Sequence, residues 1–398
     1  MRDRLECNVP GGLAATWHDS QKMNPHPTPR NVLEAFFLFW VCVGAIRVEA
    51  EKLELPPGIS LWNMSTSLRT GLGYKDNVTL SSIDSKGSAF EATGLDLLVF
   101  RLPWNNWQLN FFASGSDTRY FERSVGVDTE QSAAASVQLT WLLGNGWKSL
   151  STVQYSFLNQ VLDVSATTQT QIRQQVLGHT VTGRQGVRKD FSPYWAEATF
   201  GVSRNFFGRP LDYYWQGGPQ LTVGRSYGHG SDVSLRYQIE EAQFDTFEQT
   251  RLDGTLIAGA PLEFRIQSLE LAWQHHWDTQ RRWRSSTRLS AQLNRDNGPG
   301  YFDFLEYRAA EQLRYRATTW EASAQVSVTQ YDFDRRTLSA ADPTKQSRTP
   351  ILFSLRGEKR LSKSWKMYAS YDYERSVSNV ELERYGSNIG LAGIEYAF

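Results

Sequence analysis

Polar and apolar residues alternate along most of this chain with a period of two. In one clear segment Trp107, Leu109 and Phe111 fall on one side, and Gln108 and Asn110 on the other. Because successive side chains of a strand point to opposite faces, this segment predicts a strand with one apolar face. The same alternation recurs in segments that begin near residues 65, 132, 196, 233, 288, 320 and 365, and in the last residues of the chain. The pattern predicts an all-β protein.

Two kinds of connection separate these strands. Seven are tight turns, at Leu102–Asn105, Gly144–Gly146, Asp190–Pro193, Gly228–Asp232, Asp278–Gln280, Arg316–Thr318 and Leu361–Ser364. The others are longer and polar, at Asp76–Ser88, Phe206–Gly218, Glu241–Gly259, Asn294–Gly300, Asp332–Thr349 and Ser376–Gly386. Seven turns join fourteen strands, and one more strand at each end makes about sixteen. Short turns that alternate with longer loops are typical of outer-membrane barrels, with the short turns on the periplasmic side.

The charged residues decide which face of the strands meets lipid. In the strand Trp283–Leu293, Arg284 and Arg288 alternate with the apolar residues. Turning this strand over would place both arginines in hydrocarbon, at a cost of ~2–4 kcal/mol each near the midplane. The apolar face is therefore expected to face outward. Aromatic residues flank the short turns, as in the interfacial girdles of membrane barrels.

Composition excludes a helical membrane protein. The mean hydropathy is -0.47, and the one apolar run, Ala35–Ile46, is too short to span a bilayer comfortably. It follows Arg30 and precedes a small-residue motif ending at Ala50, so we interpret residues 23–50 as a signal peptide cleaved after Ala50. Residues 1–22 are too polar for a signal sequence and are expected to be an upstream extension, with translation starting at Met23. Residues 51–64 are then a short periplasmic leader, and 65–398 the barrel.

Cysteines and net charge narrow the function further. Both cysteines, Cys7 and Cys42, precede the cleavage position, which excludes a disulfide scaffold or a thiolate metal site in the remainder. Lipidation of Cys42 is disfavoured because Trp40 and Val41 before it are bulky. Removing residues 1–50 takes away five basic and five acidic residues, and 42 minus 5 leaves 37 of each. A neutral chain has no basic surface for nucleic acid.

The last strand carries a family resemblance. In Ser387–Phe398, the residues Ala392, Ile394, Tyr396 and Phe398 share one face. The pair Tyr396 and Phe398 resembles the C-terminal signature of bacterial outer-membrane β-barrels, which their assembly machinery reads. The resemblance implies a transmembrane antiparallel up-and-down barrel in the bacterial outer membrane, with membrane lipid and the barrel-assembly machinery as partners. Whether barrels associate into homo-oligomers stays open.

Three short motifs add a weaker resemblance. They are Tyr74-Lys75-Asp76-Asn77-Val78, Arg375-x-x-Ser378-Asn379 and Tyr385-x-x-Asn388. They are similar to patterns found in large outer-membrane barrel families, some of them tied to exopolysaccharide export. They support the class of protein better than its substrate.

Charges of both signs are expected to face the interior of the barrel, the lumen. The predicted residues are Arg236, Glu240, Arg284, Arg288, Glu321, Lys366, Asp372 and Glu374. Two interpretations are open: these charges line a hydrated pore, or they pair with each other and occlude the interior. Because side chains alone do not fill a barrel of about sixteen strands, we favour the pore. The predicted function is a porin-like channel for hydrophilic solutes or polysaccharide, with a non-conducting barrel for surface assembly or adhesion as the first alternative and a barrel hydrolase as the second.

The histidines do not predict an enzyme, a cofactor or a metal site. His229, His275 and His276 fall near expected periplasmic turns, the wrong end for the chemistry of outer-membrane phospholipases and omptin-type proteases. His275 and His276 are adjacent, so they point to opposite faces and cannot chelate one metal together. His179 lies in a segment, Gln171–Lys189, whose alternation is too weak to place its strand.

Two charged residues conflict with the pattern. Arg225 falls on the apolar face of its strand but near a turn, where its long side chain reaches water. Glu311 falls in the middle of the apolar stripe beside Tyr307, Ala309 and Leu313. For Glu311 we expect a bulge or a different register.

Overall fold

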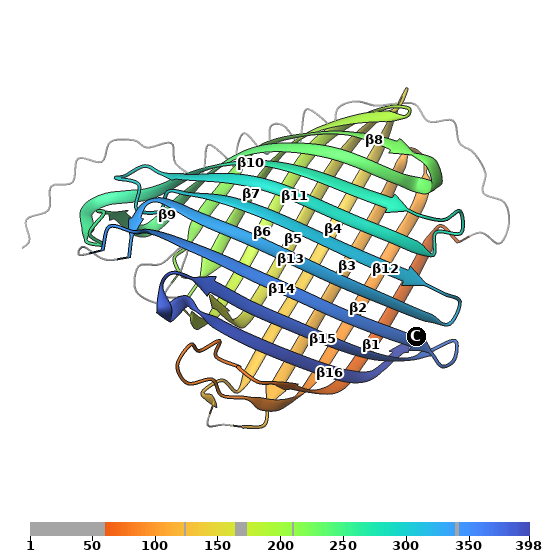
Figure 1. The fold of residues 1–398 in the computed structure, drawn as a ribbon. Coiled ribbons are helices and arrows are strands. Elements are labelled where there is room, and N and C mark those ends of the chain that lie inside the picture. The colour runs from red at the N-terminus through yellow and green to blue at the C-terminus, as the bar shows by residue number, and fades with distance from the viewer. Residues whose placement is uncertain (1–59, 123–124, 164–172, 209–210, 339–341) are drawn as a thin grey trace, which may run out of the picture. The chain divides into compact units, whose positions relative to one another are not determined.

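Sixteen antiparallel strands form a closed barrel within the residues that the computed structural model describes, which are 60–122, 125–163, 173–208, 211–338 and 342–398 (Figure 1). Each strand pairs with its neighbours in sequence, and β1 pairs with β16 to close the sheet. This confirms the predicted up-and-down barrel of about sixteen strands. The expected upstream extension, signal peptide and cleavage position lie outside the described residues.

The strands are β1 (Trp62–Lys75), β2 (Ser88–Trp104), β3 (Trp107–Tyr120), β4 (Thr129–Gly144), β5 (Trp147–Asp163), β6 (Arg173–Phe191), β7 (Tyr194–Phe207), β8 (Tyr214–Tyr227), β9 (Ser231–Thr250), β10 (Leu256–His276), β11 (Trp283–Asp296), β12 (Phe304–Arg316), β13 (Trp320–Thr337), β14 (Lys345–Arg360), β15 (Trp365–Ser378) and β16 (Tyr385–Ala397). All seven predicted tight turns lie at strand connections of one end, the short-turn end. β1 begins at Trp62, earlier than the expected Ser65. Among the described residues, no helix is long and apolar enough to cross a membrane.

The opposite, long-loop end differs from the prediction. The expected loop Glu241–Gly259 is mostly strand, because β9 continues to Thr250 and β10 begins at Leu256. In this part of the hairpin Glu241 lies directly opposite Arg265, and both residues are on the outward face. The outward face is therefore charged there. The backbone ladder therefore continues past the apolar belt, and the alternation that marks a strand in sequence fades where both faces meet water.

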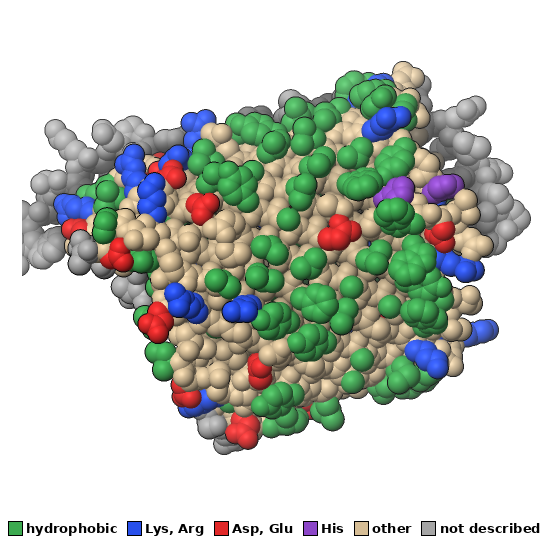
Figure 2. Space-filling view, viewed as in Figure 1, with side chains coloured by type: hydrophobic (Ala, Val, Ile, Leu, Met, Phe, Trp, Pro, Cys, Tyr) green, Lys and Arg blue, Asp and Glu red, His purple; other side chains and the backbone are tan. Residues whose placement is uncertain are grey.

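The outer face of the barrel is apolar in its middle. Leu72, Leu221, Leu289 and Ile394 point outward with 44–65% of their surface exposed. Figure 2 shows hydrophobic side chains across this face, with most charged side chains gathered toward the two ends. An apolar band on a closed sheet, with no unpaired strand edge, is what a hydrocarbon environment requires. The barrel is therefore a transmembrane barrel of the outer-membrane type.

Aromatic rings cluster along the short-turn end. The ring of Tyr315 lies 4.5 Å from that of Trp283 and 4.7 Å from that of Trp320, and Trp365 lies 4.8 Å from Tyr396. These outward rings form an interfacial girdle. Trp195 is an exception: it shares its face with Glu197 and points inward, with the Arg188 guanidinium 4.1 Å above its ring. Of the aromatic residues expected at these turns, the side chain of Trp104 is not described.

The structure explains the positions of the two charged residues that conflicted with the pattern, Arg225 and Glu311. Arg225 points outward next to the β8–β9 turn, with its guanidinium 5.5 Å from the ring centre of Tyr194. For Glu311 the expected bulge or register change is wrong, because β12 pairs without interruption with both neighbours. Glu311 points outward, and Thr287 Oγ1 donates a 2.5 Å hydrogen bond to it. The alternation had placed it correctly.

The seam between β1 and β16 brings together residues far apart in sequence. Glycines make the approach close: a Cβ on Gly393 would lie 2.1 Å from the backbone oxygen of Thr70. At the long-loop end, Asn388 donates to the Asp76 carboxylate from its backbone nitrogen at 2.7 Å and its side chain at 2.6 Å. Asn77 donates to the Gly386 carbonyl at 2.9 Å. The motif residues around Asp76 and Asn388 thus fasten the ends of the two closing strands together.

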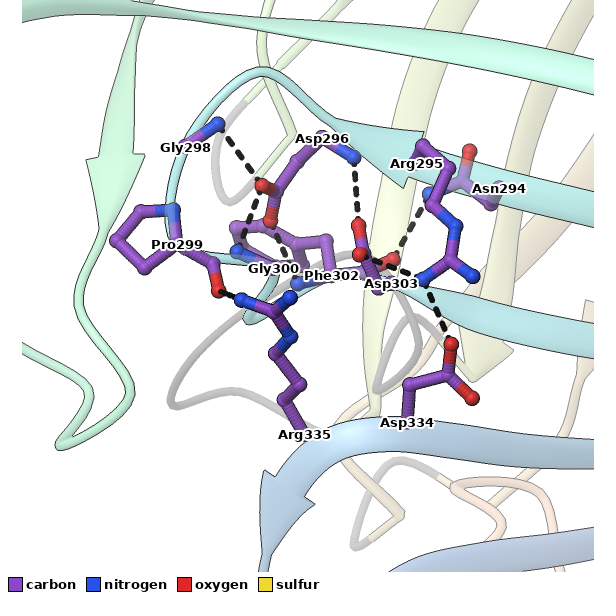
Figure 3. A network of polar contacts seen from close by, with 10 residues as sticks. All are labelled: Asn294, Arg295, Asp296, Gly298, Pro299, Gly300, Phe302, Asp303, Asp334 and Arg335. Carbon is purple, nitrogen blue, oxygen red and sulfur yellow. Dashed lines mark hydrogen bonds and ion pairs between the residues drawn. The ribbon is translucent and has the colours of Figure 1, made fainter.

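Loops at the long-loop end fold onto the inner wall. In the β11–β12 loop, the Asp296 carboxylate accepts 2.9 Å hydrogen bonds from the backbone nitrogens of Gly298, Gly300 and Phe302 (Figure 3). This arrangement directs Phe302 to within 5.6 Å of the ring of Phe264. Phe302 is 3% exposed, in an apolar cluster that covers part of the inner wall. The loop therefore has a fixed shape and narrows this side of the mouth.

Candidate functional site

The lumen wall is the candidate site, because the polar faces of the strands converge there. Residues directly opposite each other in neighbouring antiparallel strands point to the same face. On this basis all eight predicted charges alternate with the outward apolar residues and lie on the inner wall. The structure places them on β9, β11, β13 and β15.

Two of the predicted charges on β9 have partners on neighbouring strands. Arg236 lies 3.3 Å from Glu270 of β10, an ion pair between directly opposed residues. Glu240 accepts a 2.7 Å hydrogen bond from Gln216 of β8. These contacts hold the side chains against the wall.

The predicted charges on β13 and β15 also have partners. Glu321 forms ion pairs with Arg314 and Arg316 of β12. Lys366 lies 2.7 Å from Glu395 of β16. The two carboxylates on β15 accept 2.5 Å hydrogen bonds, Asp372 from Ser354 and Glu374 from Tyr385.

A cavity of about 480 Å³ opens on the wall between β9 and β13. Three predicted residues, Arg236, Arg284 and Arg288, line it. The remaining lining side chains that point inward are mostly amides and hydroxyls: Gln238, Ser268, Gln274, Ser286, Ser290, Gln292, Gln312 and Gln325. Such a wall offers many hydrogen-bond donors and acceptors to water and to polar solutes.

Sequence reasoning missed three charged residues of this cavity. Glu270, Glu306 and Arg308 also line it. Glu306 and Arg308 belong to β12, a strand whose register the sequence left undecided because Glu311 falls in its apolar stripe. The sequence did contain a signal for them. Glu306, Arg308, Gln312 and Arg314 are separated by even numbers of residues, so in a regular strand they share one face.

An ion pair connects opposite parts of the barrel near the long-loop end. Arg348 Nη2 of β14 lies 2.5 Å from Asp163 Oδ2, at the end of β5, and the two side chains are only 7% and 6% exposed. Val161 of β5 packs with Tyr385 of β16 in the same region. The end of β5 therefore leans inward and contacts the far wall, which narrows the lumen.

The four histidines of residues 51–398 do not assemble with each other. His229 lies in the β8–β9 turn, and His275 on the outer face lies 3.0 Å from the Tyr227 hydroxyl. His276 points inward and His179 outward, where Nδ1 of His179 lies 2.7 Å from the hydroxyl of Tyr155. Among the described residues, no group of three or more His, Cys, Asp or Glu side chains could hold a metal.

Comparisons with known proteins give structural similarity only. No protein-family model matches the chain, and no curated protein matches it in sequence. Among solved structures, it is similar to OccAB1 of Acinetobacter baumannii, with 11% identity, a TM-score of 0.47, and coverage of 88% of this chain and 99% of that one. It is also similar to an anion-selective porin from Comamonas acidovorans, with 11% identity, a TM-score of 0.42, and coverage of 85% and 99%.

A third similar structure is described as a bacterial polysaccharide outer membrane secretin, with 10% identity, a TM-score of 0.40, and coverage of 84% of this chain and 98% of that one. The class of this protein follows from its own geometry: a closed sheet, an apolar outer band, an aromatic girdle and a polar inner wall. On those grounds the chain is a transmembrane β-barrel of the outer-membrane type.

Proposed function

We propose that the protein is a passive channel for small hydrophilic solutes across the outer membrane, without catalytic activity. The observation that carries the proposal is the polar, charged cavity on the inner wall of β9–β13. A sheet of sixteen strands is wide enough that side chains alone do not fill its centre. The inward lean of β5 favours small solutes over a polymer, because it narrows the mouth.

A planar bilayer tests this function directly. Folded protein should give discrete single-channel steps, and liposomes containing it should swell at rates that fall as neutral sugars grow from mono- to tetrasaccharides. Heat-unfolded protein at the same concentration serves as the control. Absence of steps and of swelling would rule the channel out.

A second candidate is a non-conducting barrel that serves surface assembly or adhesion. The buried Asp163–Arg348 contact and the apolar cluster around Val161 favour it, because both fill part of the mouth. The same bilayer recordings separate the candidates, since an occluded barrel gives no conductance while remaining folded.

We also propose that the precursor is exported through the signal peptide at residues 23–50, and that the assembly machinery recognises the C-terminal strand with Tyr396 and Phe398. Phe398 is 74% exposed at the short-turn end, beyond the last paired residue of β16. Deleting Phe398 should lower the amount of folded barrel in the outer membrane while leaving refolding in detergent intact. Equal amounts in the membrane would contradict the proposal. Association of barrels into homo-oligomers stays a prediction that chemical cross-linking can test.

A further inference from the structure

Two arginines of β11 face the lumen without a partner. Among the described residues, neither Arg284 nor Arg288 makes an ion pair or a hydrogen bond, and the buried Nε of Arg284 has no acceptor. The other two arginines of the cavity have partners: Arg236 lies 3.3 Å from Glu270, and Arg308 donates a 3.3 Å hydrogen bond to Ser327. An uncompensated guanidinium in a partly enclosed polar cavity is a ready partner for an anion.

The neighbours of Arg288 leave space around it. The residues directly opposite are Ala272 on β10 and Ala310 on β12, so neither directly opposed side chain fills the space beside it. Arg284 lies opposite another cation, Arg314. Because like charges opposite each other destabilise a sheet, this arrangement lowers stability instead of raising it.

The cavity as a whole carries excess positive charge. Four arginines and three glutamates line it; Glu311 points outward, so the inward charges are four arginines against Glu270 and Glu306, and 4 minus 2 is +2. On the same strand, Ser286 and Ser290 flank Arg288 and offer hydroxyls to the cavity, and Ser290 lies between Glu270 of β10 and Arg308 of β12. A ligand that matches the positive charge and the polar wall has one anionic group, which binds a guanidinium. It also carries hydroxyls, which hydrogen-bond to the amide and hydroxyl side chains of the wall.

We propose that this cavity binds small hydroxylated carboxylates, such as sugar acids, with Arg288 holding the carboxylate. Arg284, four residues and roughly 13 Å along the strand toward the short-turn end, provides the next position for the anion. The proposal names a substrate class for the proposed channel. It rests on the proposed function, because it assumes that the bound solute is passing through the barrel.

Binding to the folded barrel in detergent tests the site without requiring conductance. Titration calorimetry should detect galacturonate, while galactose, which has the same skeleton without the carboxylate, should bind at least about tenfold more weakly. Arg288→Gln should weaken galacturonate binding by about tenfold or more, and Arg288→Lys by less. The matched control is Arg184→Gln, since Arg184 faces the lumen on β6, outside the cavity, and should change binding less than about twofold.

Several outcomes would overturn the assignment. These are equal affinity for galactose and galacturonate, unchanged affinity in Arg288→Gln, or inorganic phosphate binding as tightly as galacturonate. Heat-modifiable migration in gels verifies that each variant is folded. In bilayers, the unmodified protein should prefer chloride over potassium, and Arg288→Gln should reduce that preference. Binding without any conductance would refute the channel but keep the site, whereas conductance without binding would refute the site alone.

Discussion

Glu311 is a carboxylate on the lipid-facing side of a membrane strand. It lies in register between Thr287 and Val326, on the same face as Leu313, four residues before the girdle residue Tyr315. Among the described residues, its one hydrogen-bond donor is Thr287. Transferring a carboxylate into hydrocarbon costs free energy, and a single hydroxyl partner offsets only part of it.

We predict that Glu311→Leu raises the free energy of unfolding by about 1 kcal/mol, because removing the carboxylate from hydrocarbon outweighs the lost hydrogen bond. Urea titration of the barrel in lipid vesicles, followed by tryptophan fluorescence, measures the change. The reverse substitution two residues along, Leu313→Glu, should destabilise the barrel. A loss of stability in Glu311→Leu would mean that the carboxylate has a partner outside this chain.

The described end of β5 departs from a regular barrel wall, because its pairing with β4 stops at Asn159. There Asp163 reaches the inner wall of β14 and pairs with Arg348, while the backbone of Val161 donates a 2.9 Å hydrogen bond to Glu130. Glu130 also accepts from Tyr120 at 2.5 Å and lies 3.4 Å from Lys75. These contacts join the strand end to four other strands and hold it across the mouth.

Breaking the pair should open the mouth without unfolding the barrel. Removing one partner of a buried ion pair costs ~3–5 kcal/mol, and here the end of β5 can separate from β14 while the backbone ladder stays intact. We predict that Asp163→Asn increases single-channel conductance and leaves heat-resistant migration unchanged. Arg316→Gln, which removes an ion pair at the other end, should leave conductance unaltered. Unchanged conductance in Asp163→Asn would show that this contact does not limit passage.

Around the barrel, each strand divides its side chains between lipid and lumen. On β11, Ser286 and Ser290 line the cavity, whereas Leu289 and Ala291 pair with outward residues of β10 and β12. Residues 51–398 contain no cysteine, so single cysteines can be introduced without background reaction.

We predict that single cysteines at Ser286 and Ser290 react with a charged, water-soluble thiol reagent at least about tenfold faster than cysteines at Leu289 and Ala291, because only the first pair meets water in a lipid vesicle. Mass spectrometry over time measures the rates. Equal rates at all four positions would contradict the membrane-spanning arrangement.

The period-two pattern and the seven tight turns were sufficient to predict the barrel and its strand number. Both are local properties, since alternation and turn chemistry depend on neighbours in sequence. The same pattern placed Arg236, Arg284 and Arg288 on the lumen side. It did not predict the extent of β9 and β10 beyond the belt, because water on both faces removes the alternation there while backbone pairing continues.

In the strands with clear alternation, the pattern alone assigned each side chain to lipid or to lumen, because successive residues of a strand point to opposite faces. Which charges are compensated depends on how the strands pair in the folded barrel. Arg236 has a carboxylate opposite it and Arg288 has alanines, a difference set by strand register. The contact between Asp163 and Arg348 likewise joins positions 185 residues apart, and no local pattern encodes it. Closure of the sheet brings such residues together, so the shape and charge of the lumen follow from the fold.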